Sequence, residues 1–400
     1  MIQGGGLAFL EALGPQKIRP GLSRTRALLD GLGSPDRSFR TLLIAGTNGK
    51  GSTAAFASSI LTAAGVCTGL YTSPHLIRVT ERVRIAEMEV SGAHLDEVLE
   101  HVSHIAGTGS LAPSYFEAMT VSAFELFRRA RVAVAVVEVG IGGRLDATNV
   151  LEPDVSIVTN VGADHLEVLG PSLEAVAREK AGIFRRGRPA LTAERGPLLR
   201  TLEEEARRAG ARLFPVPPTD RYADCCPLVG RHQRENLALA VAAAAAFCPL
   251  TEEVIRKGVA SVRWPGRLQS VQREGRRPLL LDGAHNPDGA RALAAWLDEA
   301  GLAQRVDLIF GGLADKDLEE VFAPLGPRVR RVVLTAPSNP RAENPRRLAA
   351  RLGRPDARCT SGVAEALAHL DAEGTGDGAP IIVTGSLFLV GDALGLLERA

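Results

Sequence analysis

Short apolar runs rich in Val and Ile alternate along the chain with longer segments of helical periodicity. We predict seven strands from these runs, at 41–45, 132–139, 155–161, 278–283, 306–312, 331–336 and 380–386. We expect helices in the segments between them, at 52–64, 117–130, 172–182, 196–210 and 233–247. The alternation of strands and helices predicts an α/β fold with parallel sheets that are covered on both faces.

The stretch VRWPGRLQS at 262–270 divides the chain, because Pro and Gly interrupt a helical region and a new series of strands and helices follows. We expect a first domain at 1–264, a P-loop ATPase-like domain with a mainly parallel sheet. A linker at 265–267 leads to a smaller, Rossmann-like α/β domain at 268–400.

Composition excludes some classes of function. The chain has 400 residues, with 47 Lys and Arg against 46 Asp and Glu, so its net charge of +1 creates no overall field that attracts nucleic acid or membrane. The most apolar run, 237–247, is too short to span a bilayer, and the N-terminus does not resemble a signal peptide. The five cysteines form no CxxC pair. We therefore expect a cytoplasmic protein. We also expect a monomer.

The candidate chemistry begins at GTNGKGST, residues 46–53, directly after the apolar run TLLIA. A glycine-rich turn between a strand and a helix presents backbone N–H groups to an anion, and Lys50 adds a positive charge. Gly51 separates Lys50 from Ser52, whereas the common P-loop pattern places the hydroxyl directly after the lysine. The segment predicts a phosphate-binding loop unlike that of an ordinary GTPase or kinase. A turn without function is the alternative.

Two further strands are predicted to end near this loop. Glu138 is the first charged residue after six apolar ones, and a carboxylate buried there favours a nearby cation such as Mg²⁺. The turn GIGGRLDATN follows and carries Arg144 and Asp146, and the next strand leads to Asp164 and His165. Ligands of open α/β sheets bind at the carboxyl ends of strands, so these residues are candidates for one site. The alternative for Glu138 is an acid at a strand end that caps a loop, and the alternative for His165 is a structural histidine.

Lysine is rare in this chain. Five of the 47 basic residues are lysines, which leaves 42 arginines. An amine can lose its proton and react, which a guanidinium does not do, so a lysine inside a motif indicates chemistry. Lys50 and Lys180 are in such motifs. The alternative for Lys180 is a surface residue that pairs with Glu179.

A set of motifs covers nearly the whole chain, from about residue 15 to about residue 390: GTNGKGS, LYTSPHLIRVTERVRI, SYFEAMT, EVGIGGRLDATN, TNVGADHLEVLG, REKAGIF, GRHQREN, PGR and LDGAHNPDGA. With these motifs the chain resembles the bacterial dihydrofolate synthase/folylpolyglutamate synthase family, a branch of the Mur ligase superfamily of ATP-dependent ligases that form amide bonds. The resemblance implies a ligase that adds L-glutamate to dihydropteroate and to the γ-carboxylate of tetrahydrofolate derivatives. The reaction would pass through an acyl phosphate and release ADP and phosphate.

The resemblance also implies roles for individual residues. ATP would be bound by Asn48, Gly49, Lys50, Gly51, Ser52, Asn236, Arg267 and Asp282. Two Mg²⁺ ions would be held by Ser73, Glu138, His165 and a carbamylated Lys180. The folate substrate would contact Ser114, Tyr115, Phe116, Glu117, Arg144, Leu145 and Asp146, and glutamate would contact Ser386. Catalysis would involve Lys50, Lys180, Asp146, Arg82 near the acceptor carboxylate and His285 near the incoming amine. Phe388 stands where some relatives have a tyrosine.

Other functions remain open at this point. A Mur ligase that extends a UDP-muramyl peptide would act on a UDP substrate and not on dihydropteroate. A nucleotide-binding regulatory protein without catalysis would be expected to lack Glu138, Lys180 or His285, and all three are present. A plain P-loop kinase would not need the second domain.

Overall fold

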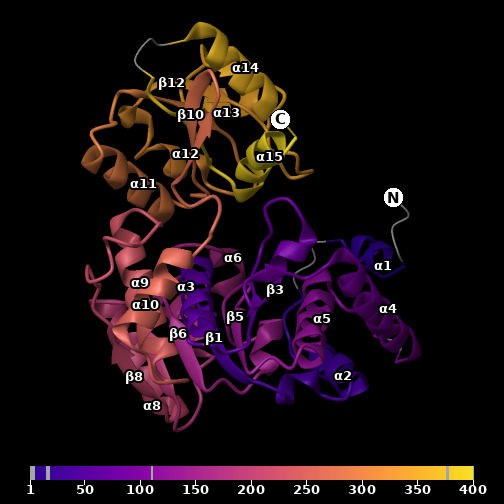
Figure 1. Ribbon diagram of the computed structural model, residues 1–400. Helices are drawn as coiled ribbons and strands as arrows, with labels where there is room; N and C mark the ends of the chain where they lie inside the picture. Colours follow the sequence, from indigo (N-terminus) through magenta and orange to yellow (C-terminus); the bar gives the residue numbers. More distant parts are fainter. Residues whose placement is uncertain (1–4, 15–18, 110, 375–377, 400) are drawn as a thin grey trace. The chain divides into compact units, whose positions relative to one another are not determined.

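The computed structural model describes residues 5–14, 19–109, 111–374 and 378–399 (Figure 1). The chain divides into two compact units. Unit 1 comprises the described residues up to His75, Val79–Pro227 and Arg234–Val262, and unit 2 comprises Leu76–Arg78, Leu228–Gln233 and the described residues from Arg263 onward. The main division thus follows Val262, two residues before the expected end of the first domain. Two short segments that we expected in the first domain group with unit 2.

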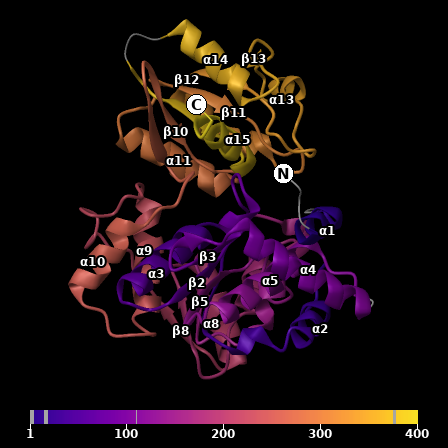
Figure 2. The same ribbon diagram turned by 45° about the vertical axis from the view of Figure 1, so that its right-hand side comes forward.

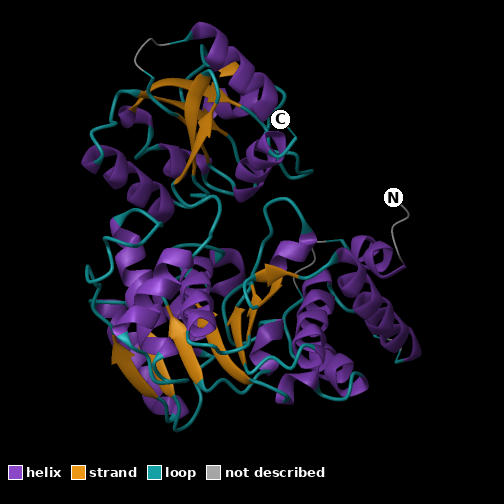
Figure 3. Ribbon diagram, viewed as in Figure 1, coloured by secondary structure: helices purple, strands orange, loops and turns teal. Residues whose placement is uncertain are grey.

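Unit 1 contains an eight-stranded sheet with the order β4-β3-β2-β5-β1-β6-β7-β8 (Figures 1 and 3). Its strands are β1 (Arg40–Ala45), β2 (Thr68–Tyr71), β3 (Val83–Ile85), β4 (Met88–Glu89), β5 (Val134–Glu138), β6 (Val155–Val158), β7 (Pro189–Thr192) and β8 (Arg212–Pro215). In the series β2-β5-β1-β6-β7-β8, each strand runs parallel to its neighbours. Strands β3 and β4 extend the β2 edge of the sheet with antiparallel pairing. The register pairs Glu138 with Ile44, so the end of β5 lies beside the end of β1, where the P-loop begins.

Helices cover both faces of this sheet (Figure 2). They are α1 (Gly5–Leu13), α2 (Ser23–Gly31), α3 (Lys50–Ala63), α4 (Gly92–Thr108), α5 (Tyr115–Arg129), α6 (Leu166–Leu169), α7 (Leu173–Ala181), α8 (Pro197–Ala209), α9 (Arg231–Ala244) and α10 (Glu252–Ser261), with 3-10 turns η1 (Pro35–Arg37), η2 (Val79–Arg82) and η3 (Ala147–Val150). Leu43 and Val137 are buried in one core with Phe124 and Phe127 of α5. The largely buried α3 contacts β1, β2, β5 and α10.

Unit 2 contains a six-stranded sheet with the order β13-β12-β11-β14-β10-β9, and β9 is its antiparallel edge strand. Its strands are β9 (Gln269–Arg273), β10 (Arg276–Leu281), β11 (Val306–Phe310), β12 (Val329–Leu334), β13 (Arg358–Cys359) and β14 (Ile381–Thr384). Its helices are α11 (Pro287–Glu299), α12 (Leu318–Phe322), α13 (Pro345–Arg351), α14 (Val363–Glu373) and α15 (Leu387–Leu397), with the 3-10 turn η4 (Gly326–Arg328). Alternate residues of β10 enter two cores: Leu280 packs with residues of α11, and Leu279 and Leu281 pack with residues of α14 and α15.

The seven predicted strands and five predicted helices all form, and the predicted α/β fold class is confirmed. The sequence pattern did not predict the short or edge strands β2, β3, β4, β7, β8, β9 and β13. None of the described helices combines the length and the apolar character that a membrane crossing needs.

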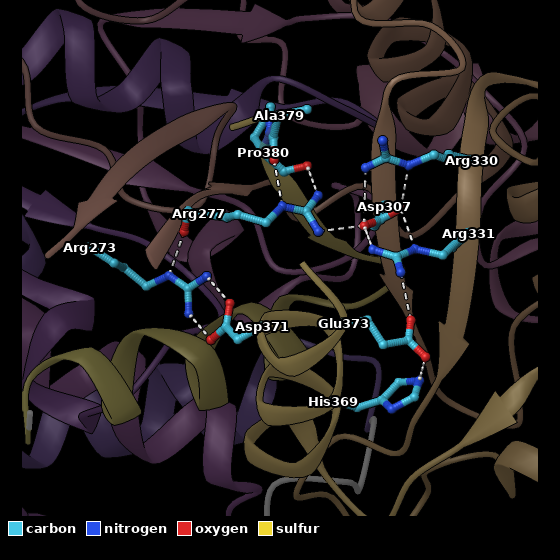
Figure 4. Close-up of polar contacts among 10 residues, drawn as sticks. All are labelled: Arg273, Arg277, Asp307, Arg330, Arg331, His369, Asp371, Glu373, Ala379 and Pro380. Atoms are coloured by element: carbon cyan, nitrogen blue, oxygen red, sulfur yellow. Dashed lines mark hydrogen bonds and ion pairs between the residues drawn. The ribbon is translucent and has the colours of Figure 1, made fainter. Parts of the chain in front are cut away.

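A group of charged side chains joins the starting ends of the strands in unit 2 (Figure 4). The side chain of Asp307, on β11, is fully buried and accepts hydrogen bonds from Arg277, Arg330 and Arg331. Arg277 also donates to the backbone oxygen of Ala379 at 2.7 Å. Burial opposes ionisation of Asp307, but the three guanidinium groups hold its pKa well below the usual range. One carboxylate therefore links β10, β11 and β12.

Candidate active site

The P-loop between β1 and α3 depends on two glycines. Gly46 (φ 151°) and Gly49 (φ 82°) adopt backbone conformations that side chains disfavour. A Cβ atom on Gly46 would lie 1.7 Å from Oγ1 of Thr159, and one on Gly49 would lie 2.2 Å from Oδ1 of Asn236. Asn236, on α9, therefore lies directly against the P-loop, and its contact with ATP stays a prediction.

The segment after β6 holds the P-loop through hydrogen bonds. The backbone N–H of Asn48 donates to Oδ1 of Asn160 at 2.9 Å, and Oγ1 of Thr159 donates to the backbone oxygen of Asn48 at 2.6 Å. Oγ1 of Thr47 accepts from the backbone N–H of Gly162 at 2.9 Å. Our sequence reasoning did not assign Thr159 and Asn160 to the site, although they belong to the quoted motif TNVGADHLEVLG. Their position at the carboxyl end of a buried strand was the available signal.

The charge of one lysine acts on a second lysine from a separate element at this site. Nζ of Lys50 donates to the backbone oxygens of Gly46 at 3.0 Å and Thr47 at 3.2 Å. Lys180, on α7, is only 3% exposed. Burial and the charge of Lys50 lower the pKa of Lys180 to about 7, although Asp164 acts in the opposite direction. The alternative of a solvated surface lysine is therefore wrong. A large share of the amine is uncharged at neutral pH, which is the form that adds CO₂.

The candidate metal ligands are only partly brought together by direct contacts. Glu138 is buried, and its Oε2 accepts from the backbone N–H of Ser73 at 3.1 Å. His165 lies 3.8 Å from Asp164 and 3.6 Å from Glu167. The described residues contain no group of three or more His, Cys, Asp and Glu that could hold a metal. Mg²⁺ commonly takes one or two carboxylates together with phosphate oxygens and water, so a buried carboxylate beside a serine fits a magnesium nucleotide.

Asp146 organises the glycine-rich turn that follows β5. Its Oδ1 accepts from the backbone N–H of Thr148 at 3.0 Å, and its Oδ2 accepts from the backbone N–H of Ile141 at 2.9 Å. Burial raises the pKa of Asp146, although these hydrogen bonds favour the ionised form. A Cβ atom on Gly140 would lie 3.1 Å from Oδ2 of Asp146 and 2.7 Å from the Phe116 ring. Two expected substrate-binding residues therefore lie close together, and the catalytic role of Asp146 stays a prediction.

The polar members of the SYFE segment support helix α5. Oγ of Ser114 accepts from the backbone N–H of Glu117 at 3.2 Å, and Oε2 of Glu117 accepts from the backbone N–H of Ser114 at 2.7 Å. This reciprocal capping box begins the helix. Glu117 also pairs with Arg24 at 3.0 Å. The side-chain contacts of Ser114 and Glu117 are thus structural, and their contact with substrate stays a prediction.

Aromatic rings lie beside a buried cation at the start of α5. The Phe116 ring lies 6.0 Å from the ring of Tyr71, and the hydroxyl of Tyr71 lies 3.1 Å from Oγ1 of Thr120. The guanidinium carbon of Arg82 lies 5.3 Å from the centre of the Tyr115 ring, and Arg82 is 7% exposed. Burial raises the pKa of Tyr71, so this residue stays a neutral phenol.

The remaining folate-site candidates lie on the turn before η3. The side chain of Leu145 is exposed, and its backbone oxygen accepts from the N–H of Gly21 at 3.2 Å. Nε of Arg144 donates to Oε1 of Glu179 at 3.3 Å. Leu145 thus offers apolar surface, whereas Arg144 is tied to α7.

In unit 2, Asp282 follows β10 and is buried. Its carboxylate accepts from the backbone N–H groups of Leu268 at 2.9 Å and Ala284 at 3.0 Å. Burial raises its pKa, while the positive charge of Arg267 acts in the opposite direction. A Cβ atom on Gly283 would lie 2.5 Å from Nη1 of Arg267. The linker arginine and Asp282 are thus neighbours.

His285 and Ser386 follow the ends of the adjacent parallel strands β10 and β14. Nδ1 of His285 lies 2.8 Å from the backbone oxygen of Gly283. Oγ of Ser386 accepts from the backbone N–H of Phe388 and caps α15. The backbone N–H of Gly385 donates to the oxygen of Ala284 at 3.0 Å, which ties the two loops together.

Both parts of the chain match known families. Residues 44–214 match the Mur ligase middle domain, and residues 266–387 match the Mur ligase glutamate ligase domain. The dihydrofolate synthase/folylpolyglutamate synthase of Bacillus subtilis (strain 168) is 34% identical over 347 residues, which are 77% of this chain and 79% of the relative. The protein of the same name from Escherichia coli (strain K12) is 38% identical over 336 residues, which are 79% and 78% of the two chains.

Solved structures extend the similarity to almost the whole chain. Folylpolyglutamate synthase of Mycobacterium tuberculosis, complexed with ADP and AMPPCP, has a TM-score of 0.91 and 34% identity, and the match covers 99% of both chains. The E. coli FolC in complex with DHPP and ADP has a TM-score of 0.88 and 33% identity over 98% of this chain and 97% of that one. The resemblance that the motifs indicated is confirmed: the chain belongs to the dihydrofolate synthase/folylpolyglutamate synthase family of Mur ligases.

Proposed function

We propose that this chain is an ATP-dependent ligase that adds L-glutamate to dihydropteroate and to the γ-carboxylate of tetrahydrofolate derivatives. Family membership over both units supports this activity, and relatives have been solved with ADP, with DHPP and with L-glutamate. ATP would be bound by the P-loop together with Asn236, and the roles of Arg267 and Asp282 in ATP binding rest on the family resemblance. We expect the reaction to take place in the cytoplasm, with the protein as a monomer.

The observation that carries the proposal is the buried amine of Lys180 near the charge of Lys50. Burial of an amine near another cation is unfavourable for folding, so its presence at the P-loop favours a catalytic use. A regulatory protein without catalysis would have no need of it. Carbamylation would convert the amine into an extended carboxylate, which matches the metal-binding role that the family resemblance implies.

The first chemical step has to activate a carboxylate. The acceptor carboxylate attacks the γ-phosphorus of ATP, which breaks the bond to ADP and gives an acyl phosphate with a good leaving group. The P-loop N–H groups and Lys50 would hold the phosphates, and Arg82 would offset the charge of the acceptor. Mg²⁺ held by Ser73, Glu138, His165 and carbamylated Lys180 would supply further neutralisation of phosphate charge when bound.

The second step joins the amino acid. The uncharged amine of L-glutamate attacks the acyl carbon, phosphate leaves and the nitrogen loses a proton, which gives the amide. Ser386 would bind glutamate, and His285 would orient the amine or accept its proton. Tyr115, Phe116, Leu145 and Asp146 would hold the pteridine and aromatic parts of the folate substrate.

The test is ADP release by the purified chain in the presence of Mg²⁺. Dihydropteroate and tetrahydrofolate are each offered with and without L-glutamate, and a UDP-muramyl peptide is offered in parallel. We expect glutamate-dependent ADP release with one or both folate substrates and none with the UDP substrate. If no substrate gives ADP release, the ligase proposal fails. If only the UDP substrate does, the chain is a Mur ligase of peptidoglycan type.

A further inference from the structure

Arg82 is a buried cation whose partners are unusual. Nε of Arg82 donates to Nδ1 of His75 at 2.9 Å, and the guanidinium lies over the Tyr115 ring. Within the described part of the chain, no carboxylate is paired with Arg82, although buried charges are ordinarily neutralised by an opposite charge. In contrast, Arg24, near the same helix start, pairs with the carboxylate of Glu117. The positive charge of Arg82 is therefore left uncompensated by these partners.

The hydrogen bond fixes the state of the imidazole. Nδ1 of His75 can accept from Nε of Arg82 only if it carries a lone pair, so the ring proton is on Nε2 and the ring is neutral. The backbone also holds the arginine, because the N–H of Thr72 donates to the backbone oxygen of Arg82 at 3.0 Å. The contact uses Nε, so the guanidinium keeps its fork of two Nη groups for an anion.

We propose that His75 is a positioning residue of the ligase: it aims the guanidinium of Arg82 at the anionic acceptor without neutralising it. This inference depends on the proposed function, in which Arg82 receives the acceptor carboxylate and the phosphoryl group. A carboxylate at position 75 would orient the guanidinium as well, but it would cancel the charge that attracts the substrate. A neutral acceptor atom provides the orientation and leaves the charge in place.

Three substitutions of His75 distinguish its effect on the orientation of the Arg82 guanidinium from its effect on the charge near that group. His75→Asn keeps a neutral acceptor, His75→Leu removes the acceptor, and His75→Asp keeps an acceptor but adds a negative charge. His101→Asn is the matched control, because His101 is an exposed histidine on α4. Thermal unfolding of every variant shows whether the fold is retained, and binding of ADP alone shows whether the nucleotide site is intact.

We measure kcat and KM for dihydropteroate at saturating ATP and glutamate. His75→Asn is expected to stay within about threefold of wild type, because it keeps the acceptor, and His75→Leu to lose about 10- to 100-fold in kcat/KM, as expected for a misplaced reacting group. His75→Asp is expected to lose more than His75→Leu while it keeps its melting temperature and ADP affinity. Equal losses of kcat/KM in His75→Asp and His75→Leu would overturn the positioning role. Losses of kcat/KM that occur only together with a lower melting temperature would overturn it as well. A wild-type enzyme without turnover would instead overturn the proposed function, and this inference with it.

Discussion

The backbone N–H of Ser73 donates to Oε2 of Glu138 across 3.1 Å, and so joins two segments that are 65 residues apart in the sequence. Ser73 lies in the loop that follows β2, and Glu138 is the last residue of β5. Because β2 and β5 are adjacent parallel strands, a serine and a buried carboxylate meet at the same edge of the sheet, beside the start of the P-loop.

Substitution Glu138→Gln tests the proposed metal role of this pair. An amide oxygen can still accept the hydrogen bond from Ser73, so the fold is expected to be retained. The lost negative charge weakens attraction for a divalent cation. We expect the Mg²⁺ concentration that gives half-maximal ADP release to rise at least about tenfold, or activity to disappear. Glu152→Gln, at an exposed glutamate, is the control. An unchanged metal titration would remove Glu138 from the metal site.

Lys180 offers a prediction in which stability and activity change in opposite directions. Lys180→Met removes the amine that would carry the carbamate, so turnover should fall to background. The same change removes a buried ammonium. Since each unit of pKa shift corresponds to about 1.4 kcal/mol and the pKa of Lys180 is lowered from 10.5 to about 7, the free energy of unfolding at pH 7 should rise by on the order of 4 kcal/mol. Urea unfolding and ADP release measure the two effects.

The pH dependence of the protein's stability follows from the direction in which the pKa of Lys180 is shifted. The pKa of Lys180 in the folded state, about 7, lies below the value of about 10.4 for an unfolded chain. The unfolded state therefore binds more protons between these values, and wild-type stability should rise with pH across this window relative to Lys180→Met. Lys180→Arg should be inactive as well, because a guanidinium forms no carbamate. Full activity of Lys180→Arg would contradict this account. A difference in stability between wild type and Lys180→Met that does not change with pH would contradict it as well.

Strand and helix periodicity predicted the main elements because β1, β5, β6, β10, β11 and β14 contain runs of buried apolar residues, mostly Val, Leu, Ile and Ala. The two-residue strands β4 and β13 and the half-exposed β9 carry too little pattern to be predicted. Motifs identified the P-loop, but periodicity could not show that Asn236 lies against Gly49, since the two are joined only by tertiary packing. The lowered pKa of Lys180 likewise depends on burial and on Lys50, which only the fold brings together.

Lys50→Ala tests the phosphate-binding role of the P-loop. Hydrogen bonds to charged groups contribute about 1.5–3 kcal/mol, so kcat/KM for ATP should fall by about 10- to 100-fold. The change should also raise the pKa of Lys180, because the charge of Lys50 lowers it. Lys257→Ala, at an exposed lysine on α10, is the control. Unaltered ATP kinetics in Lys50→Ala would exclude the P-loop role.

Asp307→Asn tests whether one buried carboxylate holds the starting ends of the strands in unit 2. The substitution leaves Arg277, Arg330 and Arg331 without their shared negative charge (Figure 4). Loss of one partner of a buried ion pair costs about 3–5 kcal/mol, so unit 2 should unfold at a lower urea concentration. Asp315→Asn, which removes only an exposed pair with Arg341, should stay within about 0.5 kcal/mol of wild type.

Tryptophan fluorescence reports on this unit, because both tryptophans, Trp264 and Trp296, lie in unit 2. The pKa of Asp307 is depressed, so its stabilisation is present above the unfolded value of about 3.9 and is lost as the pH falls toward the folded value. The difference between wild type and Asp307→Asn should therefore be constant from pH 5 to pH 7, conditions that are roughly one unit or more above the unfolded pKa, and should shrink only below about pH 4. Equal urea midpoints for wild type and Asp307→Asn at pH 7 would show that the arginine cluster contributes nothing to the stability of unit 2.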